Sequence, residues 1–469
     1  MPTSTGSLLE LENIASLLLD AAREYPNKPA LVTEHTSLTF AELAAVVANI
    51  ARKLRNEGVV EGNFVGINLP TALHIPFMLA VFSLGAVAVR YTPTVAAAGQ
   101  IELDWVFSVA PMDGTGSTKN VLVTEDYFTP GDITGPLQLT NPKTPQNLCL
   151  VVHSSGTTGT PKAVGLSIDL VRQRLVNHTH WVGALPYLSI FDMGAWIGVR
   201  SALVHLANAE TYHVISSANE AVARVRAAGI RQVECSPAQL TQLVEAAKRG
   251  GWQLDSLESV VVTGAAIPGE LARQASETLG CEVFVRYGAT EMDVISLRNW
   301  RDHRSSNVGS PLPGVEVCVT EEGAVLLKAP WMVDGYLSNP SASHDHFIDG
   351  WYHPGDKGYL DQGSLVLEGR TKDIINVGGM KVSTSVIENW LPGKFGVTDA
   401  AGFAHIAENG LEEYWLAVVG DIPDLAALAL ELKNEFAIAA PARIVQETEI
   451  QRNSNGKIMR SRLSERHAL

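Results

Sequence analysis

Short apolar runs alternate with amphipathic stretches along most of the chain, and this alternation restricts the folds that the chain can adopt. The runs expected to form strands are 64–67, 121–123, 148–152, 259–262 and 281–285. Helical patterns lie among them, for example at 237–249 and 268–279. Strands that alternate with helices usually form parallel sheets whose faces those helices cover. The pattern therefore predicts an α/β protein with largely parallel sheets.

Two further stretches predict local structure within this scheme. Thr39 and Glu42 have the spacing of a capping box, in which each side chain accepts a hydrogen bond from the other residue's backbone N–H. The helix that starts there should bury Leu43, Val47, Ile50 and Leu54 on one face. The apolar stretch from Leu69 to Val89 is long enough to cross a membrane, but prolines, a histidine and a glycine interrupt it. We therefore expect a buried helix that runs into a buried strand, and no membrane span.

The length and the changing texture of the chain predict its domains. A chain of 469 residues fits two or three domains, and a hydrophobic fraction of 46% is enough to bury their cores. After about Val308, glycine and proline become frequent and short β-type runs occur. We predict a large N-terminal domain, residues 1–370, built from α/β subdomains plus a small β-rich subdomain. A small α+β C-terminal domain, residues 371–469, should follow.

Charge and cysteine content argue against several classes of function. Asp and Glu number 50 against 35 Lys and Arg, which gives a net charge of −15 and disfavours nucleic acid as a partner. The N-terminus lacks a basic region and is not expected to be a signal peptide. The chain has four cysteines, Cys149, Cys235, Cys281 and Cys318. Their spacing fits no metal site and indicates buried, reduced thiols in a cytoplasmic protein.

The strongest local signal is a loop rich in glycine and hydroxyl side chains that directly follows the apolar run 148–152. Its residues include Ser154, Ser155, Gly156, Thr157, Thr158, Gly159 and Lys162. Glycines allow the backbone to approach phosphate oxygens, and the hydroxyl and amide groups donate hydrogen bonds. Lys162 adds a positive charge. Although such a loop can also be an ordinary surface loop, its position after a buried strand indicates a phosphate site. It is not a Walker A motif.

Three weaker signals follow in order. In the segment 287–291, Tyr287 could stack on a base, Thr290 could reach a phosphate and Glu291 could bind Mg²⁺. Asp356 follows a glycine turn, where a carboxylate can bind a ribose diol. Lys457 ends an Asn-Gly turn near the C-terminus. Taken alone, the first could be a plain strand-end turn and the last a solvated lysine.

In this order the four segments resemble the AMP-forming adenylating superfamily, which includes acyl- and aryl-CoA synthetases, firefly luciferase and the adenylation domains of nonribosomal peptide synthetases. The resemblance covers most of the chain and extends to 38–43, 263–268 and 308–314. It implies an acid–thiol ligase that uses ATP and Mg²⁺ to convert a small carboxylic acid into an acyl-adenylate with release of pyrophosphate. The acyl group would then pass to a thiol, with coenzyme A as the default acceptor.

The resemblance also implies a role for each matching residue. The loop that ends at Lys162 would bind the β- and γ-phosphates, Thr290 the α-phosphate, and Glu291 the Mg²⁺ ion. Lys457 would bridge the attacking carboxylate and the α-phosphate, and Lys372 would be the hinge of a mobile C-terminal domain. Further nucleotide contacts would come from Gly264, Ala265, Tyr287, Gly288, Asp356 and Arg370, and acid contacts from Ser189, Asp192, Gly264 and Ala289.

The segment 186–196 departs most from the family pattern. Many CoA ligases have a histidine or aromatic gate near the position of Ser189, and Arg286 stands where a small polar residue is commoner. The sequence from Phe191 to Trp196 is similar to amino-acid adenylation domains, in which an aspartate at the position of Asp192 pairs with the substrate's amino group. The alternative is that Asp192 caps a helix that starts near Met193.

Several alternatives therefore stay open at this point. The acceptor thiol could belong to coenzyme A or to a carrier-protein phosphopantetheine, and the acid could be an amino acid. A luciferase-type oxygenase would keep the same motifs. A non-catalytic nucleotide-binding relative would be expected to lose Lys457 or Glu291, and both are present.

Overall fold

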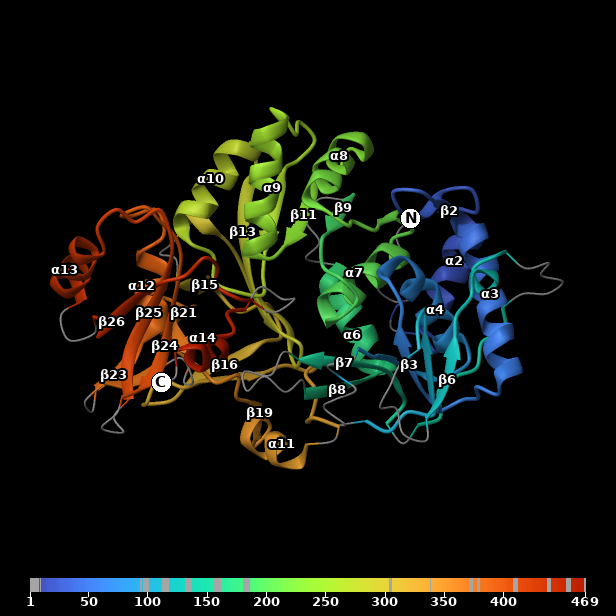
Figure 1. Ribbon diagram of the computed structural model, residues 1–469. Coiled ribbons are helices and arrows are strands. Elements are labelled where there is room, and N and C mark those ends of the chain that lie inside the picture. Colours follow the sequence, from blue (N-terminus) through green and yellow to red (C-terminus); the bar gives the residue numbers. More distant parts are fainter. Residues whose placement is uncertain are drawn as a thin grey trace.

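The structure of the protein is a computed structural model (Figure 1). It describes residues 8, 10–92, 95, 101–111, 118–130, 137–144, 146–154, 162–179, 186–302, 306–337, 339–370, 374–377, 380–407, 412–436, 440–452 and 457–467.

The first α/β unit is built on a six-stranded sheet with the strand order β6-β5-β3-β4-β7-β8. Its strands are β3 (Phe64–Asn68), β4 (Val87–Arg90), β5 (Trp105–Ser108), β6 (Lys119–Leu122), β7 (Leu148–Ser154) and β8 (Lys162–Ser167). All neighbours are parallel except the hairpin of β7 and β8. One hydrophobic core joins this sheet to α2 (Ser16–Glu24), α3 (Phe40–Glu57), α4 (Thr71–Ser83), α6 (Ile168–Thr179) and α7 (Trp196–Ala207). A small sheet of β1 (Pro29–Val32), β2 (Ser37–Thr39) and β10 (Tyr212–His213) adds Leu31 and Tyr212 to the same core.

Local sequence determines where these elements start. The capping box at the start of α3 is confirmed, because the Thr39 hydroxyl accepts from the Glu42 amide at 3.2 Å and the Glu42 carboxylate accepts from the Thr39 amide at 2.8 Å. The apolar stretch after Leu69 forms α4 and then β4, also as predicted. In the part of the chain that the structure describes, no helix combines the length and apolarity needed to span a membrane.

The second α/β unit has a five-stranded sheet with two very different faces. Its order is β14-β13-β12-β11-β9, and only β14 runs antiparallel. The strands are β9 (Tyr187–Ser189), β11 (Gln232–Cys235), β12 (Ser259–Val262), β13 (Glu282–Ala289) and β14 (Asp293–Asn299). One face packs its valines and leucines under α8 (Ala218–Ala228), α9 (Pro237–Gly250) and α10 (Gly269–Leu279). Since side chains alternate along a strand, Ser189, Glu234 and Arg286 point from the other face.

Two smaller units complete the chain. The β-rich part forms a sheet of β15 (Asn307–Gly309), β20 (Asp356–Asp361) and β21 (Ser364–Arg370), and a second sheet of β16 (Glu316–Val319), β17 (Val325–Lys328), β18 (Phe347–Ile348) and β19 (Trp351–Tyr352), with α11 (Pro340–His346). The C-terminal part contains β22 (Ile374–Val377), β23 (Met380–Ser383), β24 (Val397–Ile406), β25 (Glu412–Gly420) and β26 (Arg443–Gln446), with α12 (Thr384–Trp390), α13 (Leu425–Phe436) and α14 (Arg460–Arg466). It has hydrophobic cores of its own.

Three expectations need correction. β6 spans Lys119–Leu122 rather than 121–123. β13 continues to Ala289 because it pairs with β14 out to Asp293, so Tyr287 lies in a strand and not in a turn after one. Cys318 is exposed because it alternates along β16 with Val317 and Val319, which pack against a hydrophobic core, whereas the other three cysteines are buried. All four thiols are free.

Candidate active site

Two residues predicted to bind the nucleotide contact each other. The Tyr287 hydroxyl on β13 donates a hydrogen bond to Oδ2 of Asp356, which starts β20 and is buried. Asp356 pairs with Arg370 across β20 and β21, so the backbone of Arg370 is adjacent too. The structure thus brings together the residues expected to bind adenine and ribose, although they are 69 positions apart.

Gly264 lies just past the end of β12, the neighbour of β13. Its φ of 92° belongs to the left-handed region, where a side chain would be strained, so glycine suits this turn. Ligands of parallel α/β sheets bind outside the carboxyl ends of the strands. The turn at Gly264–Ala265 is therefore at the expected place for a nucleotide contact.

A chain of contacts connects Lys162 to Glu291. The Lys162 ammonium, buried at the start of β8, donates to Nε2 of His346 at 2.8 Å and lies 4.8 Å from the centre of the Tyr336 ring. The Tyr336 hydroxyl donates to Oε1 of Glu291 at 2.8 Å. Nδ1 of His346 donates to the carbonyl of His353 at 2.7 Å, which leaves Nε2 as the acceptor for the lysine. The predicted phosphate lysine and the predicted metal carboxylate are therefore part of one cluster.

Sequence reasoning missed Tyr336 and His346. Neither belongs to a recognisable motif, and both reach the cluster through contacts between distant segments. Ser154 pairs with Lys162 across the β7–β8 hairpin, which places one end of the predicted phosphate loop beside this cluster. The loop residues Ser155, Gly156, Thr157, Thr158 and Gly159 lie outside the described residues, as does Lys372.

Arg174 on α6 holds the turn that carries Thr290 and Glu291. It is fully buried, and its guanidinium donates to the carbonyls of Thr290, Glu291 and Trp331 at 3.0 Å each. Burial lowers the pKa of Arg174 to about 10, so it stays charged at neutral pH. The same guanidinium packs over the ring of Trp196, 5.2 Å from its centre. Arg174 thereby fixes the backbone from which the predicted catalytic side chains project.

We expect Arg174→Met to lower the free energy of unfolding by about 2–4 kcal/mol, because it leaves buried carbonyl oxygens without donors. Arg174→Lys keeps the charge but cannot reach three carbonyls, so its loss should be smaller. Urea denaturation of the three proteins would measure both effects. Equal stability of Arg174→Met and the unchanged protein would show that the turn does not depend on this guanidinium.

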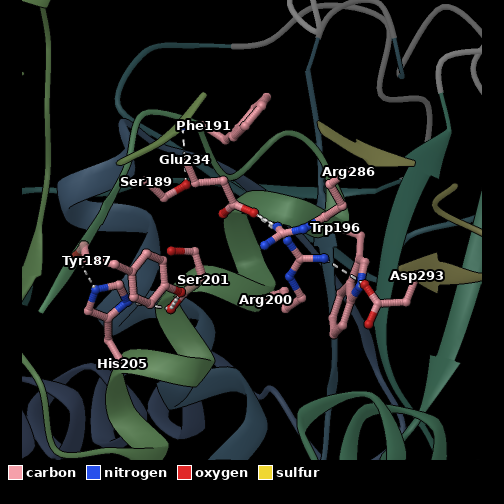
Figure 2. A network of polar contacts seen from close by, with 10 residues as sticks. All are labelled: Tyr187, Ser189, Phe191, Trp196, Arg200, Ser201, His205, Glu234, Arg286 and Asp293. Carbon is pink, nitrogen blue, oxygen red and sulfur yellow. Dashed lines mark hydrogen bonds and ion pairs between the residues drawn. The ribbon is translucent and has the colours of Figure 1, made fainter. Parts of the chain in front are cut away.

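A buried ionic network lies between α7 and the polar face of the second sheet (Figure 2). Arg200 of α7 pairs with Glu234 at 2.7 Å and with Asp293 at 2.8 Å. Arg286 also donates to Glu234, and the indole of Trp196 donates to Asp293 at 2.9 Å. Burial, and then the nearby charge of Arg200, lowers the pKa of Arg286 to about 9. Apart from the unusual arginine at 286, no motif in the sequence indicated this network.

Ser189 and Asp192 lie in different surroundings. Ser189 is buried next to Glu234, and its hydroxyl accepts from the Phe191 amide at 3.4 Å. Asp192 is exposed, and its Oδ1 accepts from the Gly194 amide at 2.7 Å. The expectation that Asp192 caps a helix near Met193 is wrong, because α7 starts at Trp196. The turn folds back so tightly that a Cβ at Gly198 would lie 1.8 Å from the Asp192 carbonyl oxygen.

Lys457 lies on the C-terminal part of the chain, directly before Ile458, which forms a β-bridge with Arg452. Arg452 is held by Asp399 at 2.6 Å, so the segment is attached to β24. The side chain of Lys457 is partly exposed. Its catalytic role stays a prediction.

The donor set fits Mg²⁺ held jointly with a nucleotide. Among the described residues, no group of three or more His, Cys, Asp or Glu side chains could hold a metal ion by itself. Mg²⁺ is usually bound through one or two carboxylates and the phosphates of the substrate. The buried carboxylate of Glu291, close to the phosphate-site lysine, matches that pattern.

The match to a protein family agrees with this geometry. Residues 18–337 match the family described as AMP-binding enzyme, and the chain belongs to that family. The resemblance to the AMP-forming adenylating superfamily is thereby confirmed. Among curated relatives, a 4-chlorobenzoate–CoA ligase of Arthrobacter sp. is 25% identical over 95% of this chain and 93% of the relative. A 2-succinylbenzoate–CoA ligase of Bacillus mycoides is 24% identical over 97% of this chain and 98% of the relative.

Solved structures share the fold over nearly the whole chain. The O-succinylbenzoate–CoA synthetase of Bacillus subtilis, in complex with ATP and magnesium ion, gives a TM-score of 0.83 at 22% identity and covers 95% of this chain and 98% of its own. The amide bond synthetase McbA of Marinactinospora thermotolerans gives 0.81 at 22% identity, with 97% and 100% covered. The predicted fold class is confirmed.

Proposed function

We propose that the chain is an AMP-forming acid–CoA ligase. It uses ATP to convert a carboxylic acid into an acyl-adenylate, releases pyrophosphate, and transfers the acyl group to the thiol of coenzyme A. Membership of the AMP-binding enzyme family and the similarity to two aryl-CoA ligases support this reaction. The observation that carries the proposal is the contact of Tyr287 with Asp356, together with the cluster that joins Lys162 to Glu291.

Adenylation follows from the chemistry of these groups. The carboxylate of the acid attacks the α-phosphorus of ATP in line, and the bond to pyrophosphate breaks. Negative charge accumulates around one phosphorus, so preorganised cations and donors provide most of the rate enhancement. Lys162 balances charge on the leaving phosphates, Thr290 donates to the α-phosphate, and Lys457 bridges the carboxylate and the α-phosphate. Mg²⁺ at Glu291 would neutralise phosphate charge.

The second half-reaction depends on the C-terminal domain. We propose that residues 371–469 rotate about Lys372 after adenylation, which withdraws Lys457 and admits the thiol. The thiolate then attacks the acyl carbon, and AMP leaves. The motion allows one active site to catalyse both half-reactions in turn, so no second active site is required.

Two alternatives remain as specific candidates. The acceptor could be a carrier-protein phosphopantetheine in place of coenzyme A. The acid could be an amino acid whose ammonium group pairs with Asp192; the exposure of this side chain makes the pairing weaker than it would be in a buried site.

Acid-dependent exchange of labelled pyrophosphate into ATP tests the adenylation step and identifies the acid. The panel should contain aryl, aliphatic and amino acids, each assayed with the unchanged protein and with Asp192→Ala. We expect aryl or aliphatic acids to drive exchange in both proteins. Exchange with amino acids alone, abolished in Asp192→Ala, would establish the amino-acid alternative.

Glu291→Gln keeps the shape of the side chain and removes its negative charge. We expect the Mg²⁺ concentration needed for half-maximal pyrophosphate exchange to rise clearly and the maximal rate to fall, because a neutral amide is a weaker Mg²⁺ ligand. The Tyr336 hydroxyl can still donate to the amide oxygen, so the fold should be retained. An unchanged Mg²⁺ titration would remove Glu291 from the metal site.

A further inference from the structure

The ionic network on the polar face of the second sheet is only partly satisfied. Both arginines contact Glu234 through Oε1, and its Oε2 is buried with no hydrogen-bond partner among the described residues. The same holds for Oδ2 of Asp293, Nε of Arg200 and the hydroxyl of Ser201. Glu234 is 1% exposed and Ser201 is fully buried. Buried polar atoms are rarely left unpaired in native proteins, so these atoms require an explanation.

These atoms lie where a ligand of the sheet would be expected. Glu234 is one residue from the carboxyl end of β11, beside Ser189 at the carboxyl end of β9. Ligands of parallel sheets bind at such ends. In the view of Figure 2, Ser189 and Ser201 both lie on the side of Glu234 that is opposite Arg286. Oε2 of Glu234, beside Ser189 on the neighbouring strand, could therefore accept a hydrogen bond from a ligand, and the buried hydroxyl of Ser201 lies on the same side in this view.

The network is also connected to the proposed catalytic turn. Asp293 is two residues after Glu291, and its partner Trp196 packs on Arg174, which holds the Thr290 carbonyl. A group bound at Glu234 would thus lie on the same framework that positions the reacting phosphate. The unpaired atoms are therefore connected, through Asp293, Trp196 and Arg174, to the turn that carries Thr290 and Glu291.

The charges within the network are balanced. Arg200 and Arg286 are matched by Glu234 and Asp293, and burial lowers the pKa of the neighbouring His205, which stays neutral. An ammonium group would add an unbalanced buried charge, which is costly. A neutral hydroxyl or aromatic amine would donate to Glu234 without that cost.

We propose that Glu234, with Ser189 and Ser201, selects acids that carry a neutral hydrogen-bond donor remote from the carboxylate, a hydroxyl or an aromatic amine. This inference rests on the proposed ligase function and names its substrate class. An acid without the donor leaves the buried oxygen unpaired. Sites built to bond a substrate OH or NH reject analogues that lack it by up to about 10⁴–10⁵-fold.

Matched pairs of acids in the pyrophosphate exchange assay test the proposal. Benzoate is compared with 3- and 4-hydroxybenzoate and with 3- and 4-aminobenzoate, and butyrate with its 3- and 4-hydroxy derivatives; β-alanine is the ammonium arm. We expect kcat/KM to be higher by about tenfold or more for a donor-bearing acid than for its parent. β-Alanine, whose ammonium group is charged, should not show this increase in kcat/KM.

Three variants separate selection from folding. Ser201→Ala removes a buried hydroxyl that has no hydrogen-bond partner among the described residues. We expect this variant to have a smaller ratio of kcat/KM between donor-bearing and parent acids. The double variant Glu234→Leu, Arg286→Leu removes both members of an ion pair, so it avoids an unpaired buried charge. It should bring that ratio to one or below. Ser83→Ala, a buried serine of α4, is the control and should leave the ratio unchanged.

The proposal would be overturned if the parent acids had kcat/KM values equal to or higher than those of every donor-bearing partner. It would also be overturned if the ratio of kcat/KM between donor-bearing and parent acids were unchanged in both folded network variants. A preference for β-alanine would also overturn it. If no acid drives exchange at all, the failure belongs to the proposed ligase function.

Discussion

Lys457→Ala is expected to reduce acid-dependent pyrophosphate exchange by roughly 10²–10³-fold, since removal of one preorganised donor to a developing charge costs about 3–4 kcal/mol. The ammonium group would contact both the attacking carboxylate and the α-phosphate, and these charge-assisted contacts strengthen as charge builds up at phosphorus. The fold should be intact, because the side chain of Lys457 is partly exposed.

The same variant should complete the second half-reaction at close to the normal rate when it receives preformed acyl-adenylate and coenzyme A. Lys433→Ala, an exposed lysine of α13 in the same domain, is the matched control and should behave like the unchanged protein in both assays. If pyrophosphate exchange survives in Lys457→Ala, this lysine does not take part in adenylation. If both half-reactions fail in a folded protein, its role is not specific to adenylation.

Lys372→Pro should separate the two half-reactions in another way. Proline fixes φ near −65° and restricts the preceding residue, so it would hold the C-terminal domain in one arrangement. One half-reaction, measured as pyrophosphate exchange or as thioester formation from acyl-adenylate, should fall far more than the other. The expectation comes from the sequence, because Lys372 lies outside the described residues.

Lys372→Ala is the control for the hinge, since it removes the side chain but leaves the backbone free to rotate. It should retain both half-reactions much better than the proline variant. Equal losses in the two half-reactions of Lys372→Pro, with unchanged thermal unfolding, would argue against a hinge at this position.

Features set by neighbouring residues were predictable from the sequence. The capping box of Thr39 and Glu42 involves residues three positions apart, and both hydrogen bonds form. The alternation of strands and helices predicted both α/β units. The end of β13 was misjudged because its last residues are ordered by pairing with β14, and hydrophobic runs do not record such a pairing.

The supporting parts of the candidate site could not be predicted, because they depend on contacts between distant segments. Arg174 looks like an ordinary polar residue of an amphipathic helix, yet it holds carbonyls more than 100 positions away. Arg200 likewise meets Glu234 and Asp293 only in the folded chain. The sequence could indicate the residues expected to contact ligands, whereas the residues that position them required the structure.

The product balance of the complete reaction tests the proposed ligase activity most directly. The protein would be incubated with ATP, Mg²⁺, coenzyme A and the acid that best supports pyrophosphate exchange, and all products would be quantified by chromatography and mass spectrometry. The ligase assignment predicts one AMP, one pyrophosphate and one acyl-CoA for each acid consumed. Formation of ADP, or release of AMP without any acyl-CoA, would contradict it.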